Sequence, residues 1–428
     1  MNRVSLHVDP ATVTGAIRPL HGVNNGPIAF GGLVDLSDYH RELRLPHVRL
    51  HDCGWPHPAV VDVPAIFPDW HKDPDDPASY TFAPTDDYLA AIVALSPQII
   101  YRLGTSIEHT PRKYHTAPPP DFAKWADICV HIVRHYNEGW ADGFHHGIRY
   151  WEIWNEPEIG AAMWSGTIEQ YLQLYAVTAR ALKAHDPTLR VGGPAAAYPK
   201  GPFLAQFLTA CVEQSLPLDF CSWHTYTADP RELAARCRYV RDLLDGLGLH
   251  GVESQLNEWN YTFAWRDVET RLRSFQALQG PVGASFAAAS LILFQDCPLD
   301  QATYYTGDTQ WFGLFDPYGA PRKTYYAFRA FVSLLDTPQR VACVREGDAD
   351  VAAWAGVAAG GQPLRVLVSN WGADAVALEL RLTWAGEMRV QAVDAAHDLA
   401  EVRRETWPAD GAWAAEMPGH TVWLIELR

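Results

Sequence analysis

The sequence predicts an α/β fold, a (β/α)8 TIM barrel followed by a small C-terminal antiparallel β-sandwich domain. From about residue 18 to 336, short apolar or β-branched runs alternate with segments of helical period, which is typical of βα units and a parallel sheet. The predicted strands are residues 20–24, 47–51, 98–103, 148–154, 189–192, 219–224, 254–258 and 302–305. Eight strands with covering helices favour a closed barrel over an open sheet.

The segments between the predicted strands carry helical apolar stripes. Residues 123–136 have the strongest one, because Trp125, Ile128, Cys129 and Ile132 recur at the spacing of one helix face. A weaker stripe occupies residues 169–185, and a good one occupies 323–335. These helices are expected to cover the outside of the sheet.

After residue 336 the pattern changes to alternating runs separated by Gly, Asp and Pro, which indicates antiparallel strands. The runs are residues 351–354, 364–368, 376–382, 388–393 and 421–427. Residues 4–8 also alternate and precede the first barrel strand, so they are expected to pair with these runs. The predicted domains are a catalytic barrel of residues 16–336 and an accessory β-sandwich of residues 1–15 plus 337–428.

Charge and aromatic content indicate which classes of molecule the chain can bind. The formal net charge of −16 and the absence of a Lys/Arg-rich stripe in the sequence argue against nucleic acid. The 17 Trp and 18 Tyr supply flat faces that suit sugar rings, although large barrels also bury many aromatic residues for packing alone. A neutral small-molecule partner fits this composition better than a polyanion.

Cysteine usage and the lack of targeting segments predict a cytoplasmic protein. The seven cysteines are scattered and form no CxxC pair, which argues against a disulfide framework or a zinc site. The sequence has no secretory signal and no run of about 18 apolar residues, so no membrane partner is expected. The oligomeric state is not readable from the sequence.

Two glutamates follow apolar strands. In IRYWEIWNEPE, residues 148–158, the fourth strand ends at Asn155, Glu156 and Pro157, and proline has no amide donor to continue the pairing. In QLNEWN, residues 255–260, the seventh strand ends at Glu258. The carboxyl ends of barrel strands carry the chemistry, and strands four and seven face each other across the barrel mouth.

Two carboxyl groups across one cleft are what glycosidic bond cleavage requires. A separation of about 5 Å gives retention of configuration, whereas about 6.5 to 9.5 Å leaves room for an inverting water. The alternative is that each carboxylate only caps a helix N-terminus. The coincidence of Asn-Glu-Pro, the second Glu and the eight strands favours the catalytic interpretation.

The WNEPE segment with the downstream glutamate resembles the clan of barrel glycosidases that carry the acid/base and the nucleophile on strands four and seven. Within that clan the chain most resembles glycoside hydrolase family 39, the β-xylosidase and α-L-iduronidase family, which also has a β-sandwich. The resemblance spans roughly residues 18–336 and rests on WEIWNEPE, MWSGTIEQYLQLY, DFCSWHTY, LNEWN and GLFDPYGAPRKTYYAFRAF. Residues 261–267 depart from the xylosidase pattern, which leaves other substrates open.

The resemblance implies that Glu156 is the acid/base and Glu258 the nucleophile. Glu156 then has to stay protonated near neutral pH, so an apolar setting near Trp154 is expected, whereas Glu258 has to stay ionised among donors. Asn155 offers an amide to the sugar 2-hydroxyl. By the HxY pattern of the family, His224 and Tyr226 are expected beside Glu258 and the ligand.

The remaining candidates carry two interpretations each. Arg49 and His51 share one face of the second strand, where Arg49 reaches the nucleophile or the sugar, or forms an ion pair inside the barrel. Trp311 and Phe312 are either a stacking platform for a sugar ring or part of the loop core. No metal and no cofactor are expected, because the mechanism needs none and the sequence has no nucleotide-binding motif.

The expected activity is that of an exo-acting β-xylosidase on xylo-oligosaccharides. Three alternatives keep the chemistry and change the substrate: a β-galactoside, an α-L-arabinopyranoside or an exopolysaccharide cut by endo action. Long loops at residues 69–77 and 110–120 are compatible with either a pocket or a groove. A fourth alternative is a noncatalytic carbohydrate-binding barrel, which would have no need for two opposed glutamates.

Overall fold

Eight parallel strands close into a barrel in the order β10-β11-β2-β5-β6-β7-β8-β9, in a computed structural model that describes residues 2–55, 57–95, 97–264 and 267–428. The strands are β2 (Gly22–Asn24), β5 (His47–Leu50), β6 (Gln98–Leu103), β7 (Tyr150–Ile153), β8 (Arg190–Ala196), β9 (Phe220–Thr227), β10 (Glu253–Tyr261) and β11 (Gln301–Tyr304). Each overlaps one predicted strand. The predicted barrel class is therefore confirmed.

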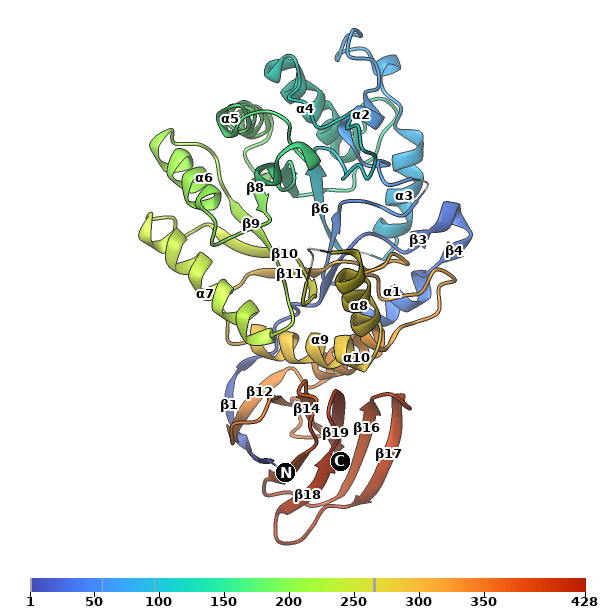
Figure 1. Ribbon diagram of the computed structural model, residues 1–428, viewed down its shortest axis with the longest axis vertical. Helices are drawn as coiled ribbons and strands as arrows, with labels where there is room; N and C mark the ends of the chain where they lie inside the picture. Colours follow the sequence, from blue (N-terminus) through green and yellow to red (C-terminus); the bar gives the residue numbers. More distant parts are fainter. Residues whose placement is uncertain (1, 56, 96, 265–266) are drawn as a thin grey trace.

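The barrel is wrapped by helices (Figure 1). They are α1 (Ser37–Leu43), α2 (Val63–Ile66), α3 (Ala83–Val93), α4 (Phe122–Glu138), α5 (Ile168–His185), α6 (Pro202–Glu213), α7 (Pro230–Gly246), α8 (Val268–Leu278), α9 (Pro281–Phe294) and α10 (Lys323–Ser333). In α4 the Asp121 carboxylate caps the first turn by accepting from the amides of Ala123 and Lys124, and Gly139 ends the helix with a left-handed φ of 77°. The predicted apolar stripe of α4 is buried against the barrel.

A nine-stranded sheet forms the second domain, below the barrel in Figure 1. Its strands are β1 (Asn2–Ala16), β12 (Gln339–Glu346), β13 (Val351–Val357), β14 (Leu364–Asn370), β15 (Val376–Arg381), β16 (Glu387–Val393), β17 (Asp398–Thr406), β18 (Ala412–Met417) and β19 (Thr421–Leu427). As expected, the N-terminal strand joins this sheet, pairing antiparallel with β12. It also pairs in parallel with β15, so the sheet is not wholly antiparallel. The core of this domain buries Val4, Leu6 and Val8 of β1.

Helix α9 lies between the barrel and the sheet, which explains why it is apolar on every side (Figure 1). It packs on β14 and β19, and the Ser369 hydroxyl of β14 donates to the Ser285 carbonyl of α9 at 2.7 Å. No single helix of the described chain is long and apolar enough to span a membrane. Only α8 and α9 together pass that test, as a pair bent by 70°.

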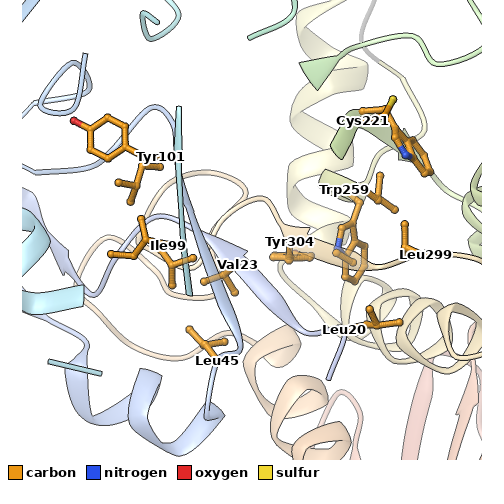
Figure 2. Close-up of a cluster of buried hydrophobic side chains, with 14 of the residues drawn as sticks. Leu20, Val23, Leu45, Ile99, Tyr101, Cys221, Trp259, Leu299 and Tyr304 are labelled. Carbon is orange, nitrogen blue, oxygen red and sulfur yellow. The ribbon is translucent and has the colours of Figure 1, made fainter. Parts of the chain in front are cut away.

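The packing of Trp259 in the barrel core fixes the direction of Glu258, the residue before it on β10. Trp259 is fully buried and makes edge contacts with Phe294 and Tyr304, both at 5.1 Å between ring centroids. Figure 2 shows Trp259 in this core beside Tyr304. Successive residues of a strand point to opposite faces, so burying Trp259 among the helices turns Glu258 toward the barrel interior.

Candidate active site

Glu156 stands on a sharp turn at the carboxyl end of β7. Trp154 and Glu156 both have left-handed backbone angles, with φ of 73° and 44°. The turn is held on each side, because the Glu156 amide donates to the Ala195 carbonyl at 3.0 Å and the Trp154 indole donates to the Met163 carbonyl at 3.0 Å. Pro157 then opens the 3-10 helix η3 (Pro157–Ala162). The Glu156 side chain is left 17% exposed, so it is open to a ligand.

Glu258 lies within β10 and is held by two donors from neighbouring strands. Arg49 Nη1 donates to its Oε1 at 2.7 Å, and the Tyr226 hydroxyl donates to its Oε2 at 2.7 Å. Both contacts favour the ionised carboxylate. The structure thus places Arg49 and Tyr226 on Glu258, as the sequence predicts.

His224 bridges the two glutamates. Its Nδ1 lies 2.7 Å from Glu156 Oε1 and 3.4 Å from Glu258 Oε2. His224 is therefore closer to Glu156 than to Glu258, the partner that the sequence suggests. One oxygen of each glutamate and a His224 nitrogen all lie within 4.8 Å of one another. The same spacing would suit a metal ion, so the expectation of no metal stays a prediction.

Burial shifts the pKa values of Glu156 and His224 in opposite directions. It raises the pKa of Glu156 to about 7, against a smaller lowering by the Arg49 charge. Burial also lowers the pKa of His224 to about 4, so the imidazole is neutral at pH 7. Its Nδ1 can accept a hydrogen bond from a protonated Glu156 or donate one to an ionised Glu156. A carboxyl that is half-protonated near pH 7 suits a general acid.

Arg49 is fully buried and joins four side chains. Besides Glu258, it donates to Glu152 Oε2 at 2.7 Å and to Asn155 Oδ1 at 2.6 Å, with a longer bond of 3.2 Å to Asn24. Arg49 therefore forms an ion pair inside the barrel and reaches the nucleophile candidate, so both predicted interpretations apply. Its bond to the Asn155 carbonyl fixes the orientation of that amide.

Glu152 and Asn257 belong to this network and were not predicted. Asn257, the residue before Glu258, donates through Nδ2 to Glu152 Oε1. Glu152 has no exposed surface and points inward from the apolar run YWEIW. A charged residue inside an otherwise apolar barrel strand was the available signal, because a buried carboxylate requires a partner.

His51 lies beside Glu258 with two further residues, Asp52 and Tyr305. His51 Nε2 is 4.0 Å from Glu258 Oε1 and 3.4 Å from Asp52 Oδ2. Burial, followed by the Arg102 and Arg49 charges, holds the pKa of His51 well below its usual range. Burial raises the pKa of Asp52 to about 7. This side of the site therefore carries a neutral imidazole and a carboxyl.

The two aromatic candidates differ in position. The Phe312 ring lies 5.7 Å from the rings of both Tyr226 and Tyr305, so the structure brings it to the site. Trp311 is 62% exposed and packs on Phe275 at 5.5 Å, outside that group of rings. It is available to a ligand only at the rim. Trp265 and Arg266, in the stretch that departs from the xylosidase pattern, lie outside the described residues.

A closed (β/α)8 barrel with opposed glutamates at the ends of β7 and β10 defines the class of barrel glycoside hydrolases. The family model for glycosyl hydrolases family 39 matches residues 34–240, which include Glu156 and His224. The match covers just under half of the chain, so over these residues the chain is similar to this family. Glu258 lies beyond the matched residues, so its assignment rests on the geometry above.

Relatives with known names agree with the family. A β-xylosidase from Geobacillus stearothermophilus is 28% identical over 52% of this chain and 49% of its own length. A β-xylosidase from Caldicellulosiruptor saccharolyticus is 26% identical over 67% of this chain and 62% of its own length. The alignments thus span about half to three-fifths of those two proteins. The crystal structure of a glucosidase from Croceicoccus marinus superposes with a TM-score of 0.82 at 28% identity, covering 100% of this chain and 99% of that one.

Proposed function

We propose that this chain is an exo-acting β-xylosidase that cleaves xylo-oligosaccharides with retention of configuration. The observation that carries the proposal is the approach of Glu156 and Glu258 oxygens to within 4.8 Å. Retaining enzymes place their carboxyl groups about 5 to 5.5 Å apart, whereas an inverting enzyme needs about 6.5 Å or more for its water. The curated relatives with β-xylosidase names support the choice of sugar.

In the first step Glu156 gives its proton to the leaving oxygen while a Glu258 oxygen attacks the anomeric carbon. The C–O bond to the leaving group breaks as the ester bond to Glu258 forms. Arg49 and Tyr226 hold Glu258 during the attack. The Asn155 amide, oriented by Arg49, donates to the sugar 2-hydroxyl, where contacts strengthen in the transition state.

In the second step Glu156 takes a proton from water, which attacks the same carbon and releases Glu258. Esterification removes the negative charge of Glu258, which lowers the pKa of Glu156 and suits it to act as a base. The neutral His224, 2.7 Å from Glu156, holds the carboxyl in place through both steps. Glu156 thus alternates between acid and base with no further cofactor.

A glucosidase is the second candidate, because the glucosidase from Croceicoccus marinus matches the whole chain. A panel of nitrophenyl glycosides separates these two and also covers β-galactosides and α-L-arabinopyranosides. Release of single xylose units from xylotriose, without cutting of xylan, tests the exo mode. Cytoplasmic location is part of this proposal, and fractionation of producing cells tests it.

The nucleophile is tested by chemical rescue. Glu258→Ala should lose at least about 10³-fold in kcat, and azide should restore turnover by attacking the open face of the sugar. Glu253→Ala is the matched control, because Glu253 begins the same strand and pairs with Arg190 at 2.6 Å. Loss of activity in the control but not in Glu258→Ala would contradict the proposal. Ligand binding without hydrolysis of any glycoside would favour the noncatalytic barrel.

A further inference from the structure

Asp52 occupies an unusual position directly after β5. Its backbone is left-handed, with φ of 50°, a region that favours glycine and that aspartate tolerates better than most residues. Its side chain is buried between two other loops. Oδ1 accepts from the Ile107 amide at 2.8 Å, and Oδ2 accepts from the Tyr305 hydroxyl at 3.1 Å. The residue thus ties the loop after β6 to the end of β11.

The Asp52 carboxyl and the Glu258 carboxylate both lie near the same nitrogen of His51. His51 Nε2 lies 3.4 Å from Asp52 Oδ2 and 4.0 Å from Glu258 Oε1. A sugar ring bound at Glu258 would therefore come within reach of Asp52. The side chain retains 10% exposure, so the carboxyl is not sealed from a ligand.

Asp52 also lacks the cation that the other buried carboxylates of the site possess. Arg49 pairs with Glu152 and Glu258, whereas in the described part of the chain Asp52 has no arginine or lysine within ion-pair distance. His51 is its one ion-pair neighbour there, and that imidazole is neutral. Each carboxylate oxygen has lone pairs for more than one donor, so Oδ2 can accept a second hydrogen bond. A sugar hydroxyl supplies such a donor without adding charge.

We propose that Asp52 is a specificity-determining residue that binds a hydroxyl of the glycone, at C3 or C4 of the ring, away from the anomeric carbon that Glu258 attacks. This inference rests on the proposed function, because it takes Glu258 as the group that faces the anomeric carbon. The class of glycone that it selects is a neutral sugar with a free hydroxyl at C3 or C4. A uronic acid would place a second carboxylate against Asp52 and is disfavoured.

Binding measurements test this without relying on turnover. The probes are a xylo-configured piperidine iminosugar and its analogues that lack one ring hydroxyl each, titrated by calorimetry into wild type, Asp52→Asn and Asp52→Gly. Glycine fits the left-handed backbone, so Asp52→Gly removes the carboxyl without backbone strain. Wild type should bind one analogue, the 3-deoxy or the 4-deoxy, about 10- to 100-fold more weakly than the parent. Asp52→Gly should bind parent and analogue equally, and Asp52→Asn should fall between.

A structural role would give a different result. If Asp52 only ties the loops together, Asp52→Gly weakens parent and analogues by the same factor, and the inference is overturned. It is also overturned if the iminosugar does not bind wild type, or if Asp52→Gly binds the parent as tightly as wild type does. Asp38→Asn, an exposed carboxylate of α1, is the control and should bind as wild type. Wild type that shows the hydroxyl dependence but hydrolyses no glycoside contradicts the proposed function alone.

Discussion

Arg49 donates to Glu258 at 2.7 Å from a position with no exposed surface, and the same guanidinium pairs with Glu152 at 2.7 Å. Two buried carboxylates therefore depend on one cation. Glu156 has no such contact with Arg49 and keeps a pKa of about 7 through its burial. This difference supports the proposed roles of Glu156 as acid/base and Glu258 as nucleophile.

Removing Arg49 should destabilise the fold as well as the chemistry. Arg49→Met leaves Glu152 and Glu258 buried without a cation, and the free energy of unfolding should fall by about 3–5 kcal/mol in urea denaturation. Arg329→Met breaks a half-exposed pair with Glu42 and should cost about 0–1 kcal/mol. Equal losses in the two variants would show that the buried network is not needed for stability.

The rate should fall on the alkaline side because Glu156 must be protonated to act as the acid. With a pKa of about 7, kcat/KM for xylobiose should decline as pH rises through that value. Glu156→Gln should lose this limb and retain measurable activity on dinitrophenyl xyloside, whose leaving group needs no proton. Asp52 and Glu158 also have pKa values raised to about 7 by burial, so Asp52→Asn and Glu158→Gln are the controls. If the alkaline decline in kcat/KM disappears only in a control variant, the decline comes from the residue changed in that variant.

Glu158 should lower the stability of the protein at alkaline pH. Burial raises its folded pKa from the ordinary value of 4.5 to about 7, so the folded state holds the proton more tightly and loses that advantage as pH rises through 7. Glu158→Gln should therefore raise the free energy of unfolding at pH 8 by about 1–2 kcal/mol and leave it nearly unchanged at pH 4. Thermal unfolding at both pH values measures this. An equal gain in the free energy of unfolding at pH 4 would show that the effect does not come from the titration of Glu158.

The N-terminal strand should be essential to the sheet domain. Leu6 of β1 is fully buried, so Leu6→Ala should lower the free energy of unfolding by about 2–5 kcal/mol. Val13→Ala, in the same strand at a position that is 53% exposed, is the matched control and should change it by under about 1 kcal/mol. Denaturation of both variants tests whether β1 carries part of this core.

The barrel was predictable because its strands are buried runs and helices such as α4 carry one apolar face. Strands β12, β17 and β18 were missed, and for β17 the reason is physical. Strand β17 is exposed along nearly its whole length, so its charged sequence has no alternation to detect. The parallel pairing of β1 with β15 joins residues more than 370 positions apart in sequence. A local sequence pattern cannot predict a pairing between strands so far apart in the chain.

The glutamates of the site were predictable from strand ends, but their partners were only partly so. The sequence places Arg49, Asn155 and Tyr226 near the pair, and the structure brings them together. His224 lies nearer Glu156 than expected, although it is the register partner of Glu258 between β9 and β10. Glu152 and Asp52 were hidden, one inside an apolar strand and one in a left-handed turn that only the folded backbone defines.

The most direct test is the configuration of the first sugar released, followed by proton NMR within the first minutes of hydrolysis of a nitrophenyl β-xyloside. Because oxygens of Glu156 and Glu258 lie within 4.8 Å, we expect β-xylose first, with α-xylose appearing only by later mutarotation. Release of α-xylose first would mean that a water attacks directly, and it would contradict the assignment of Glu258 as a nucleophile.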